Sequence, residues 1–223
     1  MASTYLTRTV SSAGNRKTWT VSLWIKICED DFSDNLGILD RAGGYPDWDI
    51  GIDSSNQIRI RYAQAANSVQ LDLRSNNVLR DVNAWYHIVF KVDTTQATEA
   101  NRAKIYLNGE EVSYAISTRP SQNTDLLFNV AETILINRYD NSTPRPCVMS
   151  HFHFTDGYAY DASAFGSTDA TTGEWKINTN PNVTYGTNGF FILKDGNSVT
   201  DQSGQGNNWT VGGGTLTKTE DCP

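Results

Sequence analysis

The chain has 223 residues and a net charge of −7, and its 18 Lys and Arg residues form no basic run. This charge balance argues against a nucleic-acid-binding surface. No stretch approaches the roughly 20 apolar residues that a membrane helix needs, and the first residues lack the basic and apolar regions of a signal peptide. The length is enough to bury a large core, so we expect one large β domain or two small ones.

The three cysteines, Cys28, Cys147 and Cys222, are an odd number and lack the spacing of a metal site. We expect them to be reduced thiols in a protein assembled in a cytoplasm. A disulfide between Cys28 and Cys147 is the alternative.

Alternation of apolar and polar residues predicts the first strands of the chain. Tyr5–Val10 is predicted as an edge strand, and Thr18–Ile27 as a strand with an apolar face that includes Trp19 and Val21. A polar loop then leads to Leu36–Leu39.

The segment DWDIGIDSSNQIRIRY, residues 47–62, contains two alternating runs around a short polar turn. One register places Ile52 opposite Ile58 and Asp49 opposite Arg61. Because the apolar pattern and the charge pattern select the same register, we predict an antiparallel pair. A further half-buried strand follows from residue 69 to residue 74.

The stretch from Asn83 to Ala115 predicts two central strands and a tight hairpin. Tyr86, Ile88, Phe90 and Val92 alternate with polar or smaller residues, and a second alternating run ends at Asn108-Gly109. Asn-Gly favours a type I′ turn, in which both central residues have positive φ. This turn places Leu107 opposite Glu110.

The remaining pattern indicates an all-β chain. Strands are predicted at Thr133–Ile136 and Val148–Phe154, and the only helical signal is a short turn at Asp161–Phe165. After Gly166 the composition shifts to Thr, Asn and Gly, with strand patterns at residues 190–194 and 208–211. We expect residues 1–166 to form the main domain and residues 167–223 to pack on the sandwich or on a neighbouring chain.

Several of these segments resemble a known superfamily. The Trp-Tyr-His strand at residues 85–87 and the Tyr-Leu-Asn-Gly hairpin at residues 106–109 are similar to the middle of laminin-G-like and pentraxin-like domains. These domains belong to the concanavalin A-like lectin/glucanase superfamily. The resemblance extends to TWTVSLWIKI and MSHFHFTDGYAY. It implies a jelly-roll β-sandwich of two curved antiparallel sheets, here with a loop-rich C-terminal extension.

A narrower resemblance involves the segments FTDGYAYDASAFGSTDATTGEWKI, YGTNGFFILKD and DQSGQGNNWT. They are similar to virion-associated proteins of marine bacteriophages that carry this lectin-like domain. The resemblance implies a component of the virion surface, such as a tail fibre, a spike or a capsid appendage, assembled in the host cytoplasm.

Glucanases of this superfamily use two glutamates that alternate along one strand, which sets the distance between the acid and the nucleophile. Seven glutamates are present, and none forms a Glu-x-Asp-x-Glu or Glu-x-x-x-Glu motif. We therefore expect no enzymatic activity, and polysaccharide depolymerase is the weakest hypothesis. Asp49 belongs to an acidic alternation that is better explained as a salt-bridged sheet face, with Arg61 as its partner.

Sugar sites combine an aromatic side chain with polar groups on a concave face or rim. The candidates for such a site are Tyr45, Trp48, Asp49, Arg59 and Arg61, with His151 and His153 if their strand is adjacent. The alternative is that Trp48 belongs to the core and the arginines are ordinary surface residues. The two histidines could also ligate a metal, although no third ligand accompanies them.

Calcium is the one cofactor that we consider, because members of the superfamily often bind it through loop oxygens. Asp195, Asn197 and Asp201 form an oxygen-rich loop. Asx turns explain the same residues equally well.

Two hypotheses about function follow. The first is a binding module for host-surface carbohydrate or another receptor, without nucleic-acid or membrane contact. The second is a structural protein that holds other virion proteins together and forms a homo-oligomer, a trimer if it is a fibre. In that case residues 167–223 would lie at the interface between chains.

Overall fold

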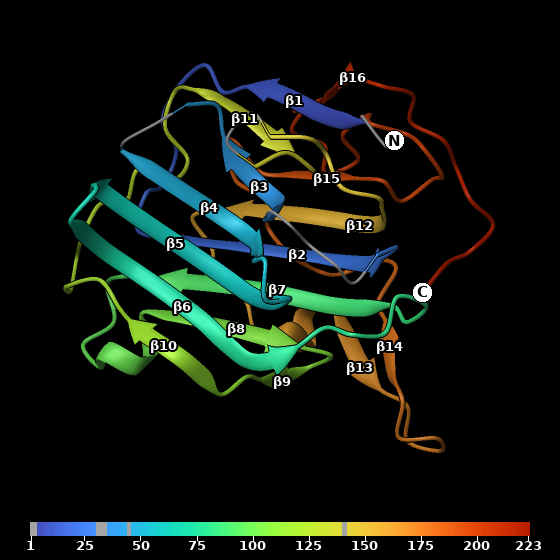
Figure 1. Cartoon of the computed structure of the whole chain (residues 1–223), viewed down its shortest axis with the longest axis horizontal. Coiled ribbons are helices and arrows are strands. Elements are labelled where there is room, and N and C mark those ends of the chain that lie inside the picture. The colour runs from blue at the N-terminus through green and yellow to red at the C-terminus, as the bar shows by residue number, and fades with distance from the viewer. Residues whose placement is uncertain (1–3, 30–34, 44–45, 140–141) are drawn as a thin grey trace.

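A computed structural model describes residues 4–29, 35–43, 46–139 and 142–223. These residues form a sandwich of an eight-stranded and a six-stranded sheet, in which every strand pair is antiparallel. Figure 1 shows the eight-stranded sheet in front of the six-stranded one. This architecture confirms the predicted all-β jelly-roll sandwich. No α-helix occurs among the described residues, so none has the length or apolarity to cross a membrane.

The eight-stranded sheet has the spatial order β10-β6-β5-β4-β3-β11-β1-β16. Its strands, in chain order, are β1 Tyr5–Thr9, β3 Leu36–Arg41, β4 Asp47–Ile52, β5 Gln57–Ala65, β6 Ser68–Val78, β10 Tyr114–Thr118, β11 Thr133–Ile136 and β16 Thr210–Gly213. Four of the eight, β3 to β6, are neighbours in this order and follow one another along the chain as simple hairpins.

The six-stranded sheet has the order β15-β12-β2-β7-β8-β9. Its strands are β2 Thr18–Ile27, β7 Tyr86–Asp93, β8 Ala103–Leu107, β9 Glu110–Glu111, β12 Cys147–Asp156 and β15 Phe190–Ile192. A separate hairpin and two 3₁₀ turns complete the described elements: β13 Gly166–Thr168, β14 Trp175–Ile177, η1 Glu99–Asn101 and η2 Ala162–Ala164.

The predicted registers are confirmed. Ile52 lies opposite Ile58 and Asp49 opposite Arg61, as the combined apolar and charge pattern required. Leu107 lies opposite Glu110, and the connecting Asn108 and Gly109 both have positive φ, as a type I′ turn demands.

One prediction about strand position is wrong. β1 is not an edge strand, because β11 pairs with one side of it and β16 with the other. β16 comes about 200 residues later in the chain, so short-range pattern could not reveal this pairing. The segment after Gly166 also adds β15 to the six-stranded sheet, and it therefore contributes a strand to each layer.

The core lies between the two sheets and is filled by the apolar faces of alternating strands. Trp19, Val21 and Leu23 of β2 are fully buried there, together with Ile88 and Phe90 of β7. The opposite face of β2 and β7 is buried as well, since a second cluster that includes Val89 and Phe165 lies outside the sheet. The centre of the six-stranded sheet is thus buried on both faces.

Candidate functional site

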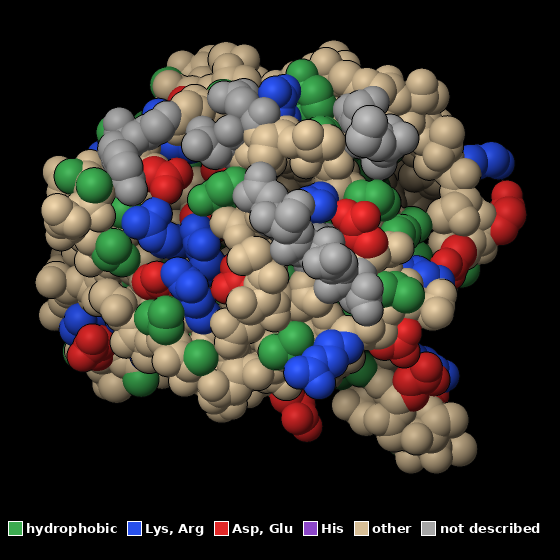
Figure 2. Space-filling model, viewed as in Figure 1, with side chains coloured by type: hydrophobic (Ala, Val, Ile, Leu, Met, Phe, Trp, Pro, Cys, Tyr) green, Lys and Arg blue, Asp and Glu red, His purple; other side chains and the backbone are tan. Residues whose placement is uncertain are grey.

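The outer face of the eight-stranded sheet carries a cluster of charged side chains, which we call the charged face. It consists of Asp47, Asp49, Asp53, Arg59, Arg61, Asp72 and Arg74. Their positions follow from alternation, because Ile50, Ile52, Ile58 and Ile60 of the same strands point into the core. Figure 2 shows basic and acidic side chains gathered over β4, β5 and β6.

The charges on this face form ion pairs between neighbouring strands. An Nη2 atom of Arg59 lies 2.6 Å from Oδ2 of Asp49, and Nη1 of Arg61 lies 2.8 Å from Oδ2 of Asp47. The expected ionic partner of Asp49 was Arg61, which is directly opposite. Each arginine instead reaches diagonally to the next carboxylate, so that partner assignment is wrong although the register is right.

The two pairs differ in burial. Asp49 is only 2% exposed and Arg59 only 7%, whereas Arg61 and Asp47 are partly exposed. Burial raises the pKa of the Asp49 carboxyl to about 6, and the Arg59 guanidinium opposes this shift, so the pair is ionised at neutral pH. Burial acts to lower the pKa of Arg59, but the Asp49 carboxylate more than offsets it and raises that pKa.

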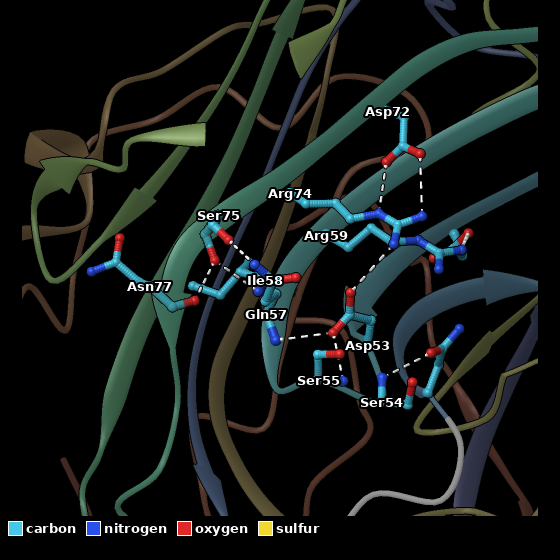
Figure 3. A network of polar contacts seen from close by, with 12 residues as sticks. Asp53, Ser54, Ser55, Gln57, Ile58, Arg59, Asp72, Arg74, Ser75 and Asn77 are labelled. Atoms are coloured by element: carbon cyan, nitrogen blue, oxygen red, sulfur yellow. Dashed lines mark hydrogen bonds and ion pairs between the residues drawn. The ribbon is translucent and has the colours of Figure 1, made fainter. Parts of the chain in front are cut away.

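Figure 3 shows how hydrogen bonds fix one end of the charged face. Arg74 lies 3.3 Å from Asp72 and 3.7 Å from Asp53. Oδ1 of Asp53 accepts hydrogen bonds from the amides of Ser55 and Gln57, which holds the turn between β4 and β5. With 29% of its side chain exposed, Arg74 is held in place and still reaches solvent.

Tyr139 adds an aromatic ring beside these charges. The guanidinium carbon of Arg59 lies 5.9 Å from the centre of the Tyr139 ring. Burial raises the pKa of the Tyr139 hydroxyl, so this group is protonated at neutral pH. Sequence reasoning missed Tyr139 because it lies after the end of β11, where alternation carries no information about facing.

The predicted aromatic members of the site are not available there. Trp48 is 2% exposed and faces the core, where its ring centre lies 4.2 Å from that of Phe128 and its indole donates to Glu132. The prediction that Trp48 binds sugar is therefore wrong. The sequence already indicates this position. Neighbouring residues on a strand point to opposite faces, so Trp48, between Asp47 and Asp49, lies on the apolar face of β4. Tyr45 lies outside the described residues.

The two histidines lie on the other sheet. His151 and His153 belong to β12, whereas β4 and β5 are in the eight-stranded sheet, so the adjacency on which their inclusion depended is not present. His153 is buried against Phe191, with ring centres 4.0 Å apart, and burial lowers its pKa well below the usual value. His151 lies at an irregularity of β12 and has a positive φ of 49°.

The oxygen-rich loop uses its side chains for its own structure. The Asp201 carboxylate accepts hydrogen bonds from the amides of Phe191, Ser203 and Asn207 and from the Ser203 hydroxyl. Asp195 accepts from Gln202, and Asn197 donates to the carbonyl of Leu216. Within the described ranges, no group of three or more His, Cys, Asp or Glu residues is placed to hold a metal ion.

The outer face of the six-stranded sheet is covered by the segment from Gly157 to Thr187, which we call the covering segment. Trp175 of this segment donates its indole N–H to Nδ1 of His87 over 3.0 Å. Nδ1 is therefore the acceptor, so Nε2 carries the proton and donates to the Ser22 hydroxyl, 2.9 Å away. The His87 ring also stacks on Trp24 at 5.0 Å. The covering segment therefore shields this face from solvent, and we call it the closed face.

The sequence of residues 2–154 matches the family described as the concanavalin A-like lectin/glucanases superfamily, in its Laminin_G_3 form. The match covers well over half of the chain. The chain therefore belongs to this superfamily, in agreement with the resemblance of its hairpin and strand motifs.

Solved structures share the fold at low sequence identity. A heptameric SAP-like pentraxin from Limulus polyphemus superposes with a TM-score of 0.51 and 11% identity, over 86% of this chain and 89% of the pentraxin chain. A putative carbohydrate binding protein from Bacteroides ovatus superposes with a TM-score of 0.56 and 16% identity. That alignment covers 99% of this chain and 61% of the Bacteroides chain. No curated protein matches this sequence.

Proposed function

We propose that this chain is a non-enzymatic carbohydrate-binding protein and that its charged face contacts the sugar. The observation that carries the proposal is the set of oriented Arg–Asp pairs on an outer sheet face that solvent reaches. Sugar hydroxyls both donate and accept hydrogen bonds, so they suit a surface that alternates guanidinium and carboxylate groups. Side chains that are already fixed by their partners lose little conformational entropy when they bind. Membership of a lectin-like superfamily supports this proposal.

The charge balance of this face favours a neutral glycan. Its three arginines and four aspartates leave only one net negative charge, and each arginine already has a carboxylate partner. A polyanion would have to displace these carboxylates, whereas a neutral sugar can bridge the pairs. Tyr139 supplies an aromatic ring next to Arg59.

Glycan-array screening followed by calorimetry tests the proposal. A neutral glycan should bind the unmodified chain, and Arg61→Ala should weaken binding about tenfold, which corresponds to about 1.4 kcal/mol. The matched control is Lys104→Ala, because Lys104 is also an ion-paired strand cation but lies on the other sheet. Equal affinity of the Arg61 variant and the unmodified chain would contradict the proposed site. Release of reducing sugar would contradict a non-enzymatic role.

We further propose that the glycan belongs to a host cell surface and that the chain is exposed on a phage particle, as a tail fibre, spike or capsid appendage. The support is the similarity of the segments from Phe154 to Ile177 and from Asp201 to Thr210 to virion-associated proteins. An antibody against the chain should label intact particles. If the chain is absent from purified particles of a phage that encodes it, the proposed location is contradicted.

A second candidate function is assembly with other virion proteins or with further copies of the chain. The two outermost strands of the eight-stranded sheet, β10 and β16, contain no charged residue, and each exposes one large apolar side chain: Ile116 and Val211. Natural edge strands usually carry charges that prevent pairing between molecules. Light scattering tests this role: a calcium-independent oligomer that Ile116→Lys or Val211→Lys dissociates would support it, and a monomer would contradict it.

A further inference from the structure

The three cysteines, which are far apart in the sequence, lie at one end of the sandwich. Cys147 begins β12 and is directly opposite Ile27, and the amide of Cys28 donates to the carbonyl of Pro146 over 3.1 Å. Cys222 comes from the segment Gly214–Cys222, which crosses this end of the molecule after β16. All three thiols are free.

Cys147 and Cys222 line the same cavity, which has a volume of about 240 Å³. Its walls are parts of β1 and β12, the loop after β15 and the segment Gly214–Cys222. Leu193, another wall residue, has a positive φ of 59° and accepts a hydrogen bond from the amide of His151, which also has positive φ. Such strained non-glycine residues concentrate at functional sites.

Cys28 is poorly placed to pair with Cys147. Cys147 shares a sheet face with Ile27 and packs against the core, and neighbouring residues on a strand point to opposite faces. Cys28 directly follows the last residue of β2, and its side chain is exposed instead of packing against the core. A disulfide needs Cβ atoms that approach each other, which this arrangement opposes. Cys222 remains as the partner that shares a cavity with Cys147.

The segment Gly214–Cys222 is held by a few polar contacts near the surface. The carbonyls of Thr215 and Leu216 accept hydrogen bonds from the side chains of Thr4 and Asn197. The Asp221 carboxylate accepts one hydrogen bond from Lys26 over 2.6 Å and one from Trp85 over 3.0 Å. These last contacts place residue 222 at the cavity. Exposed contacts of this kind hold a segment only weakly.

We propose that Cys147 and Cys222 form a disulfide under oxidising conditions and that this bond locks the segment Gly214–Cys222 over the cavity. The oxidant is a small disulfide such as oxidised glutathione. Of these two thiols, Cys222 is the exposed one and reacts first. Burial raises the pKa of the Cys147 thiol to about 12, so this thiol is protonated at neutral pH and acts second.

The exchange has two steps that balance. The Cys222 sulfur attacks one sulfur of the small disulfide, which gives a mixed disulfide and releases one small thiol that carries away the Cys222 proton. The Cys147 sulfur then loses its proton, attacks the Cys222 sulfur and displaces the second small thiol, which takes up that proton. Two protein thiols are oxidised, and one small disulfide is reduced to two thiols.

The experiment treats the native chain with oxidised glutathione and maps its disulfides by mass spectrometry of a non-reduced tryptic digest. Trypsin can place the three cysteines in three different peptides. Lys26 and Arg41 flank Cys28, Arg138 precedes Cys147, and Lys218 lies between Cys147 and Cys222. We expect the peptide that begins at Thr219 to be joined to the peptide that contains Cys147. Cys28→Ser should retain this link, and Cys222→Ser should abolish it.

Hydrogen exchange of the backbone amides from residue 214 to residue 222 tests the locking. Oxidation should slow it about tenfold in the unmodified chain and in Cys28→Ser, and leave it unchanged in Cys222→Ser. Because Cys222 is exposed, its substitution leaves the core intact. A link that contains Cys28, a link only between two copies, no link at all, or unchanged exchange after oxidation would each overturn the proposal.

Discussion

The two sheets of this sandwich have outer faces of opposite kinds. The outer face of the eight-stranded sheet is polar, ion-paired and partly open to solvent across β4, β5 and β6. The outer face of the six-stranded sheet is closed by the covering segment, which buries His87 and His153 beneath aromatic rings. Polar residues on a strand therefore either face solvent or support a covering layer, and the path of the later chain decides which.

Acid should have the largest effect on stability, and it should act through the closed face, because that face buries neutral histidines. Burial lowers the pKa of His87 from 6.5 to about 3, and it lowers that of His153 well below its usual value. Each folded-state pKa is below the unfolded one, so the unfolded chain binds more protons in acid. Stability is therefore present above about pH 6.5 and is lost as the pH falls toward 3, by about 1.4 kcal/mol per unit for each histidine.

Urea unfolding between pH 7 and pH 4 measures this loss. His87→Gln should flatten the dependence, since it removes one of the two buried groups. The Asp49 carboxyl, whose pKa burial raises to about 6, opposes part of this loss in both proteins. An equal pH dependence of the unmodified chain and His87→Gln would therefore contradict the description of a closed face.

The buried and the exposed ion pair of the charged face offer a matched comparison. Asp49→Asn should destabilise the chain by about 3 kcal/mol, because it leaves the buried Arg59 guanidinium without its carboxylate partner. Asp47→Asn breaks the more exposed pair with Arg61 and should cost less than about 1 kcal/mol. Urea unfolding at pH 7 measures both losses of stability. Equal losses would show that the buried pair does not contribute more to stability than the exposed pair.

Trp175 holds the covering segment on its sheet, and its truncation should open that face. Trp175→Ala removes the hydrogen bond to His87 and the packing on its ring, and we expect a loss of about 2 kcal/mol. Trp175→Phe keeps a ring and loses only the hydrogen bond, at a cost of about 1 kcal/mol. Limited trypsin digestion at Lys176 should accelerate in the Ala variant. A digestion rate equal to that of the unmodified chain would mean that other contacts hold the segment.

The sequence predicts local pairings well and long-range neighbours poorly. The registers of the β4–β5 and β8–β9 hairpins follow from alternation and turn chemistry within about 20 residues. The interior position of β1 depends on β16, and the separation of His153 from Arg61 depends on which sheet each strand joins. Neither is encoded locally. Trp48 was predictable as a core residue, because the alternation that located Ile50 applies to it too.

Arginine side-chain NMR tests the central claim most directly. In spectra of the Nε–Hε groups, a neutral glycan selected on the array should shift the signals of Arg61 and Arg74, which lie on the charged face. It should leave those of Arg8 and Arg102 unchanged, because these residues are bound to other loops. Shifts confined to Arg8 or Arg102, with the signals of Arg61 and Arg74 unaffected, would contradict sugar binding at the charged face.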